Sequence, residues 1–223
     1  MTSPSTRSNN YLTFSAARAR LLQESLSQRV IETDSLPVPP KYICGIDISY
    51  TKNKAFAAAV LLKFPELKIL EKICVSCKVN IPYIPGFLAF RELRPSVLAF
   101  KKLNRKPDVV LIDGHGRAHP RFFGLACHFG VVLDIPSIGV AKKKLCGEIL
   151  YDRFITGSSH PIIYKERIIG AAVKVSSNRF LYVSVGHKVS LETAIKIVLS
   201  CVKHPRMPEP IRIAHHLCTI SKY

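Results

Sequence analysis

The most constraining feature of this sequence is a short apolar run, "PDVVLIDGHG" at residues 107–116, which ends in Asp113 and a glycine-containing turn. A fully apolar run of this length is typical of a central parallel strand that is covered on both faces. Open α/β sheets bind their ligands at the carboxyl ends of such strands. The run therefore predicts an α/β fold with Asp113 at the edge where ligands bind.

The segments around this run predict a mixed sheet. Three β-like runs precede it, at residues 41–50, 55–64 and 68–79, and short turns join them. Ahead of them, residues 14–31 have helical spacing, with Ser15 as the N-cap. After residue 86 we expect a helix that is interrupted and restarts at Pro95. Later segments alternate between the two types: helices at 121–133, 190–203 and 209–218, and strands at 136–144, 167–175 and 179–187.

These elements predict one α/β domain, a mixed β-sheet flanked by helices, over residues 11–223. Residues 1–10 are polar and are expected to form a flexible segment. They lack the apolar core of a signal peptide, and no apolar run is long enough to cross a bilayer. We therefore expect a soluble, cytoplasmic protein that makes no contact with a membrane.

The charge balance points to a polyanionic partner. Lys and Arg total 33 against 15 Asp and Glu, a formal net charge of +18 that is spread along the chain. A folded body this basic repels itself, and nucleic acid would relieve that repulsion. The alternatives are a generally basic proteome or a ribosome-associated role.

The seven cysteines of a chain without a secretion signal indicate reduced thiols. "CVSC" at residues 74–77 has the spacing of a zinc or redox pair, but it lies in a β-like run. Residues three apart on a strand face opposite sides, so these two thiols do not converge easily on one metal. Buried structural cysteines are the better interpretation.

Three carboxylates lie in apolar surroundings. Asp47 interrupts a strand and shares its face with the small residues Gly45 and Ser49. Glu92 follows an apolar helical run and points toward the body of the protein, and Asp113 ends the central strand. Each could form a structural ion pair. Together they favour convergence on Mg²⁺ or Mn²⁺, which prefer oxygen ligands and assist phosphodiester hydrolysis.

The segment "IPYIPGFLAFREL" at residues 81–93 fixes a tyrosine between two prolines. Pro82 and Pro85 restrict the backbone around Tyr83 and Ile84. A stiff aromatic tip could wedge between bases at little entropic cost. The alternative is a tyrosine that plugs a gap in the core.

Several motifs resemble the endonuclease V family, over residues 41–216. The residues that carry the resemblance are "DGHGRAHPRFFGLACHFGVVLDIPSIGVAKK", "GIDISY", "PYIPGFLAFREL", "VSVGHKVSLETA" and "PEPIRIAHH", in the family's order. The resemblance implies an RNase H-like fold. It also implies a nuclease that cuts the second phosphodiester bond 3′ to deaminated adenine, either deoxyinosine in DNA or inosine in RNA. The products carry 3′-hydroxyl and 5′-phosphate ends, and the role is DNA repair.

The resemblance also assigns residues. It implies that Asp47, Glu92, Asp113 and His215 hold Mg²⁺, with Mn²⁺ as a substitute, although His216 lies next to His215. Lys142 matches a lysine near the scissile phosphate. The residues expected near the lesion or the nucleic-acid backbone are Pro82, Tyr83, Ile84, Pro85, Gly86, Gly114, His115, Gly116, His119, Arg121 and His128. Alternatively, the histidines cap a turn and the glycines only shape it.

Two other functions stay open at this point. One is a nucleic-acid-binding protein of the same fold that has lost its chemistry, which the three carboxylates disfavour. The other is a different RNase H-like nuclease such as a junction resolvase, which would need a dimer, whereas we expect a monomer.

Overall fold

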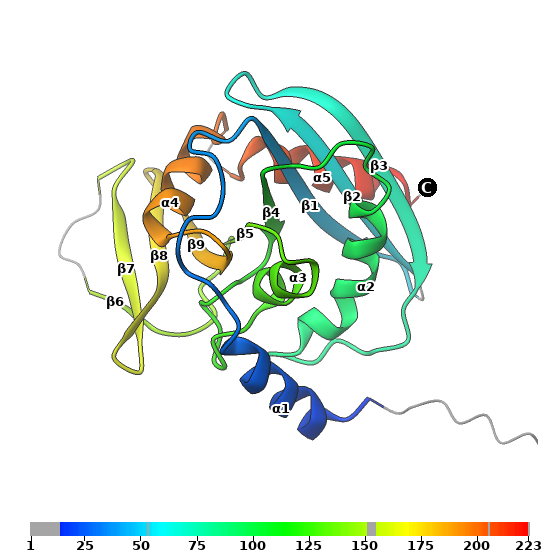
Figure 1. The fold of residues 1–223 in the computed structure, drawn as a ribbon, viewed down its shortest axis with the longest axis horizontal. Coiled ribbons are helices and arrows are strands. Elements are labelled where there is room, and N and C mark those ends of the chain that lie inside the picture. Colours follow the sequence, from blue (N-terminus) through cyan, green and yellow to red (C-terminus); the bar gives the residue numbers. More distant parts are fainter. Residues whose placement is uncertain (1–13, 53, 151–154, 205, 223) are drawn as a thin grey trace, which may run out of the picture.

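The computed structural model describes residues 14–52, 54–150, 155–204 and 206–222, so the predicted flexible segment 1–10 lies outside the described residues. Nine strands form one sheet in the order β3-β2-β1-β4-β5-β9-β8-β7-β6, with helices around it (Figure 1). The helices are α1 Ala16–Ser27, α2 Leu88–Phe100, α3 Leu125–Leu133, α4 Leu191–Ser200 and α5 Glu209–Ile220. The strands are β1 Tyr42–Tyr50, β2 Lys54–Lys63, β3 Lys68–Lys78, β4 Val109–Asp113, β5 Ser137–Ala141, β6 Glu148–Ile149, β7 Ser159–Tyr164, β8 Arg167–Ser176 and β9 Arg179–His187.

The centre of the sheet is parallel, as the apolar run predicted. Strand β4 pairs in parallel with β1 on one side and β5 on the other, and the remaining pairs are antiparallel. Its first four residues are buried, and only Asp113 at its carboxyl end is half-buried. The predicted mixed sheet is confirmed, and Asp113 lies at the expected edge.

Helices cover both faces of this sheet. On one face α4 and α5 pack against residues such as Ile43 and Val60. On the other face α2 and α3 pack against Cys44 and Ile46, the intervening residues of the same strand. Helix α1 lies against α3 at the rim. The two cores therefore hold β1 from both sides, and its side chains reach both layers.

Helix α5 lies very close to β1 because of one glycine. A Cβ on Gly45 would overlap the backbone of Pro210 and Ile211, so no larger residue fits without moving the helix. One turn beyond Ile211 the helix presents His215, and two residues beyond Gly45 the strand presents Asp47 on the same face. This close packing brings a C-terminal side chain to the central strand.

Helix α2 differs from the prediction, because it runs without interruption from Leu88 to Phe100 with Pro95 inside it. Proline supplies no N–H, so the bond to the Arg91 carbonyl is missing. Pro95 itself is buried on the helix face that also carries Ala89, Glu92, Ser96 and Ala99. Burial of this continuous face keeps the helix intact.

Other predictions met different outcomes. Ser15 is the N-cap of α1 and accepts a hydrogen bond from the Arg18 amide at 3.3 Å, but the helix ends at Ser27, before residue 31.

All seven cysteines carry free thiols. Cys74 and Cys77 are only half-buried, not buried as predicted, because β3 is the edge strand. Within the described residues no helix is long and apolar enough to span a membrane.

Candidate metal centre and nucleic-acid site

Three carboxylates from three elements face one another. Asp47 on β1 and Glu92 on α2 are buried, and Asp113 ends β4. Burial, together with the charges of Asp47 and Asp113, raises the pKa of Glu92 to about 8. Burial and the charge of Asp47 also raise the pKa of Asp113. The charges of Asp47 and Asp113 act on Glu92, and that of Asp47 acts on Asp113, so the three predicted carboxylates lie near one another. Among the described residues, the group whose possible ligand atoms all lie within 4.8 Å of one another is Asp47, His215 and Cys218.

Glu92 is held by residues to which sequence reasoning gave no role. The Tyr50 hydroxyl donates to Glu92 Oε1 at 2.8 Å. The Arg91 guanidinium lies over the Tyr50 ring, 4.3 Å from its centroid, and Arg91 also donates to the Ile81 carbonyl. Arg91 thereby links Ile81, in the turn before Tyr83, to Tyr50, which holds Glu92. The motif "GIDISY" contained Tyr50, but only the packing of α2 on β1 gives it this contact.

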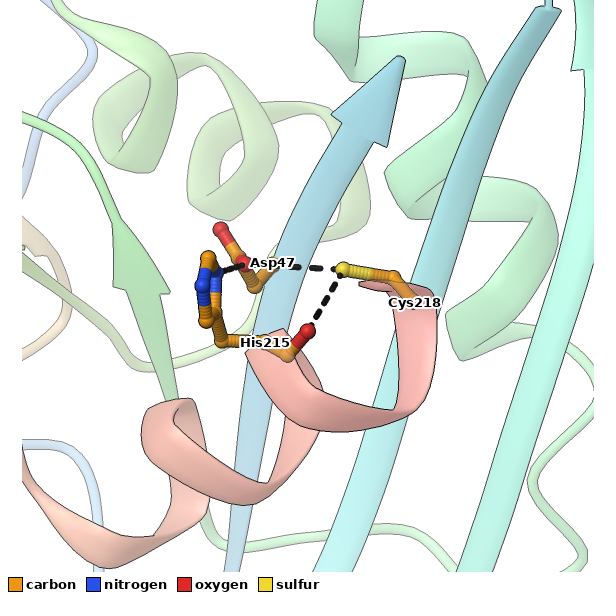
Figure 2. A group of neighbouring side chains, drawn as sticks. All are labelled: Asp47, His215 and Cys218. Atoms are coloured by element: carbon orange, nitrogen blue, oxygen red, sulfur yellow. Dashed lines mark hydrogen bonds and ion pairs between the residues drawn. The ribbon is translucent and has the colours of Figure 1, made fainter. Parts of the chain in front are cut away.

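Helix α5 supplies a histidine to Asp47 (Figure 2). His215 Nδ1 lies 2.7 Å from Asp47 Oδ2 (Figure 2). Both His215 and His216 are exposed, but within the described structure only His215 contacts Asp47. Cys218 lies one turn later, with Sγ 3.5 Å from the same carboxylate oxygen. The geometry therefore favours His215 over His216 and adds Cys218, whose thiol no spacing in the sequence linked to Asp47.

The donors at this centre suit a hard divalent cation. Burial raises the pKa of the Cys218 thiol to about 12, so the thiol stays protonated and acts as a hydrogen-bond donor to Asp47. The donors that remain are carboxylate oxygens and one imidazole, a set typical of Mg²⁺ and Mn²⁺ rather than of thiolate-bound metals. Burial and the neighbouring charges of Asp47 and Asp113 raise the pKa of Glu92, and a bound cation would offset both effects. The residues fit the metal that the resemblance implies.

Lys142 contributes a cation at the edge of the centre. Its Nζ lies 3.0 Å from Asp113 Oδ2, and its side chain is half-exposed. The neighbouring residues Lys143 and Lys144 are exposed as well. Only Lys142 of the three contacts a carboxylate of the centre in the described structure.

The proline-flanked tyrosine is exposed. Tyr83 exposes 67% of its surface, which rules out the alternative that it plugs a gap in the core. The loop behind it is fixed through the Gly86 carbonyl, which accepts hydrogen bonds from Gln23 and Arg121 and lies 3.1 Å from His119 Nε2. Arg121 also stacks over the Phe87 ring. The rigidity predicted from the prolines therefore has a second source, in side chains far away in sequence.

Other predicted contact residues have internal partners. His128 is 5% exposed and lies between the rings of Phe90 and Phe123. The Gly114 amide donates to the Val140 carbonyl, and the Gly116 amide donates to the Ser184 hydroxyl. The structure therefore places His128 in a packed aromatic cluster and uses both glycine amides inside the protein.

A small cavity of about 170 Å³ lies beside Tyr83 and contains four of the predicted residues. Its lining consists of Gln23, Tyr83, Gly86, Leu88, Ala89, His115, His119, Gly124, Leu125 and Leu145. Burial lowers the pKa of both histidines, and that of His119 falls to about 4, so His119 is neutral at physiological pH. The cavity is smaller than sites for drug-sized ligands, and its mixed lining suits one planar, uncharged group.

A mixed sheet with three carboxylates near the carboxyl end of its central strand β4, in a strongly basic protein, is typical of a metal-dependent nuclease. The particular family follows from sequence. The chain belongs to the endonuclease V family, whose sequence profile matches residues 24–216.

Similarity to known members extends over nearly the whole chain. Endonuclease V of Thermofilum pendens is 43% identical over 208 residues, which cover 92% of this chain and 88% of that protein. The solved structure of endonuclease V from Streptomyces avermitilis superimposes with a TM-score of 0.87 at 35% identity and covers 93% of both chains.

A third relative was solved with nucleic acid. Endonuclease V from Ciona intestinalis, in complex with a 24mer DNA containing an inosine followed by a ribo-adenosine, has a TM-score of 0.80 at 32% identity. The alignment covers 92% of this chain and 97% of that one. These likenesses confirm the predicted α/β fold.

Proposed function

We propose that this protein is a DNA-repair endonuclease that recognises deaminated adenine and hydrolyses the second phosphodiester bond 3′ to it. The substrate is deoxyinosine in DNA or inosine in RNA, and the products carry 3′-hydroxyl and 5′-phosphate ends. The observation that carries this proposal is the convergence of Asp47, Glu92 and Asp113 beside an exposed, rigidly held Tyr83 and its cavity. A relative bound to inosine-containing DNA supports the choice of substrate.

The lesion would be read by base flipping. Tyr83 is exposed on a fixed loop, so it can fill the gap that the extruded base leaves in the stack. The base would then enter the adjoining cavity, where His115 keeps Nδ1 for a hydrogen bond because its Nε2 faces the Lys143 carbonyl. His119 would shape the cavity, since the Gly86 carbonyl and the Arg121 amide engage both of its ring nitrogens. Because the cut falls one nucleotide away from the flipped base, recognition and hydrolysis use different parts of the site.

The catalytic roles fall to the residues of the centre. We assign Asp47, Glu92, Asp113 and His215 as the ligands of Mg²⁺, with Mn²⁺ as a substitute. When bound, such an ion lowers the pKa of a water molecule and neutralises charge on the departing oxygen. Tyr50 holds Glu92 in place, and Lys142, 3.0 Å from Asp113, offsets charge that develops on the phosphate.

The experiment that tests this function compares wild type with Asp47→Asn on end-labelled DNA and RNA strands that each contain one inosine. We expect wild type to make a single metal-dependent cut one nucleotide beyond the inosine. The variant should lose about 10³-fold or more in rate, because a ligand carboxylate supports several kcal/mol of transition-state stabilisation.

Asp108→Asn is the matched control for this experiment. Asp108 accepts hydrogen bonds from the amides of Lys41 and Tyr42, and an asparagine oxygen can still accept them. This control should cut like wild type. Cleavage that ignored the inosine, or that survived in Asp47→Asn, would contradict the proposal.

The two alternative functions have separate tests. A protein that bound inosine strands but cut none of them in Mg²⁺ or Mn²⁺ would be a binding protein of this fold. A junction resolvase would be a dimer in solution and would cut four-way junctions. We propose a monomer, so light scattering should give the mass of one 24.9 kDa chain.

A further inference from the structure

A second and much larger hollow, an open cleft of about 1280 Å³, begins at the metal centre. It lies between the turn that joins β8 to β9, the segment around Arg206, and α5. The residues that line it are Lys142, Asn178, Arg179, Phe180, Tyr182, His204, Arg206, Met207, Arg212, His215, His216 and Thr219. Four of these are Lys or Arg, three are His, and none is acidic.

The metal centre separates this cleft from the small cavity beside Tyr83. Two residues that line the cleft also contact carboxylates of the centre. Lys142 contacts Asp113, and His215 contacts Asp47. The cavity reaches the centre from other residues: His115 lies two residues after Asp113, and Ala89 lies about one turn before Glu92. The two hollows share no lining residue, and the helices that line them cover opposite faces of the sheet: α5 lines the cleft, and α2 and α3 line the cavity.

We infer that the open cleft binds the part of the nucleic-acid strand that lies 3′ to the cut bond. This inference rests on the proposed function, which puts the lesion base in the cavity and the cut on its 3′ side. A strand that enters at the cavity and passes the carboxylates must leave on the other side, where the cleft begins. The strand therefore has a defined direction on the protein, 5′ at Tyr83 and 3′ at the β8–β9 turn.

The charges in the cleft identify the residues that hold this segment. Arg212 gives two hydrogen bonds to Glu209, so much of its charge is already offset. Lys142 is paired with Asp113. Arg179 and Arg206 are exposed, and their guanidinium groups have no hydrogen bond or ion pair among the residues that the structure describes. They are the free cations of the cleft, and guanidinium groups match phosphate oxygens well.

The test uses two inosine strands that share the same sequence on the 5′ side of the cut. The long strand continues for about ten nucleotides beyond the cut bond, and the short strand ends one nucleotide beyond it. Binding is measured by fluorescence anisotropy in EDTA, so that nothing is cut, at several salt concentrations. The proteins are wild type, Arg179→Ala, Arg206→Ala and the double variant.

For the long strand, each lost phosphate contact should reduce the slope of log affinity against log salt by about 0.7, and the double variant by about 1.4. For the short strand, the slopes should stay at the wild-type value. Arg179→Lys keeps a positive charge and should restore most of the slope. Lys101→Ala, which removes an exposed charge at the end of α2 on another part of the surface, should change neither strand.

The outcomes separate this inference from the proposed function. Equal losses on the long and short strands, or no loss on either, would overturn the assignment of the cleft even if wild type cuts both strands at the inosine in Mg²⁺. Wild type that cuts neither strand at the inosine would overturn the proposed function and the inference with it. Thermal unfolding of each variant serves as a control, to check that replacement of the exposed arginines leaves the fold intact.

Discussion

At the scale of single residues, Glu92 occupies an electrostatically unfavourable position in the site. It is a carboxylate buried in the middle of a helix, near two other carboxylates, with a pKa of about 8. Its one hydrogen bond from another side chain comes from Tyr50, within the described residues. A residue kept in so unfavourable an environment is the kind that functional sites contain.

The pH dependence of stability should reveal this cost. Without metal, the folded protein holds a proton on Glu92 up to about pH 8, whereas the unfolded chain releases it near the ordinary value of about 4.3. Between these values the folded state binds more protons, so stability falls as pH rises, by at most about 1.4 kcal/mol per pH unit. Glu92→Gln removes this contribution. In EDTA, the unfolding free energy of the variant should therefore gain on that of wild type from about pH 4.3 to 8.

Urea unfolding at a series of pH values measures this difference. Glu192→Gln, at an exposed glutamate on α4, is the control and should follow wild type throughout. Curves for Glu92→Gln and wild type that stayed parallel over this pH range would mean that Glu92 titrates normally.

Tyr50 should matter through its hydroxyl alone. Tyr50→Phe keeps the ring under Arg91 and removes the hydrogen bond to Glu92. Loss of such a supporting contact typically costs about 10- to 100-fold in metal affinity, so titration calorimetry with Mn²⁺ should show a loss in this range. Tyr42→Phe removes a hydroxyl from the other end of the same strand, where it accepts a bond from Arg105, and should leave Mn²⁺ affinity unchanged. Equal affinities for Tyr50→Phe and wild type would show that Glu92 needs no support.

The sequence indicated the proposed ligands more clearly than the residues that support them. Asp47, Glu92 and Asp113 stood out because carboxylates are rare in this chain and these three interrupt apolar runs. Cys218 and Gln23 gave no such signal. Their contacts, with Asp47 and with Gly86, depend on helices that pack against segments distant in sequence. Local patterns do not contain this information.

At the scale of elements, the loop before α2 is a rigid exposed projection. Tyr83→Ala should weaken binding to an inosine strand by about 5- to 150-fold, because one stacking contact is worth about 1–3 kcal/mol. Tyr83→Phe keeps the ring and should bind like wild type. Anisotropy with paired inosine and adenine strands measures the effect.

Two further measurements on Tyr83→Ala separate recognition from folding. Its melting temperature and its affinity for Mn²⁺ should match those of wild type, because the side chain is exposed. Loss of the fold would contradict the role of a wedge at the surface.

The packing of α5 against β1 is a second feature on which the proposed metal site depends. Gly45→Ala forces a methyl group against the backbone of Pro210 and Ile211. Overpacking of this kind costs about 1–3 kcal/mol, and relief by movement of α5 would carry His215 away from Asp47. Urea unfolding should show the loss of stability, and calorimetry should show weaker Mn²⁺ binding. Stability and metal affinity equal to those of wild type would mean that α5 adjusts without moving His215.

Elements were predicted well where one periodicity dominated and less well elsewhere. The buried run at β4 and the three strands before α2 were recognisable from their apolar runs and the short turns between them. Pro95 was misleading, because its burial within α2 outweighs the lost backbone bond. Strands β6 and β7 were missed: one has two residues, and the other contains Pro161 near the edge of the sheet.

At the scale of the whole molecule, the helical layers on the two faces of β1 contribute different parts of the site. The α2 layer brings Glu92 and the Tyr83 loop, and the α5 layer brings His215 and one wall of the open cleft. The metal centre lies where the layers meet at the carboxyl ends of the parallel strands. The high net charge favours a polyanionic strand along this edge, and the basic residues of the open cleft lie on the 3′ side of the proposed cut.

Asp47 and His215 lie 168 positions apart in the sequence. A ribosome makes β1 before α5, so a nascent chain carries Asp47, Glu92 and Asp113 long before it has the histidine. If His215 is a ligand as proposed, the centre is complete only after α5 has packed against β1. Gly45, which leaves room for that packing, is therefore a folding requirement of the proposed catalyst.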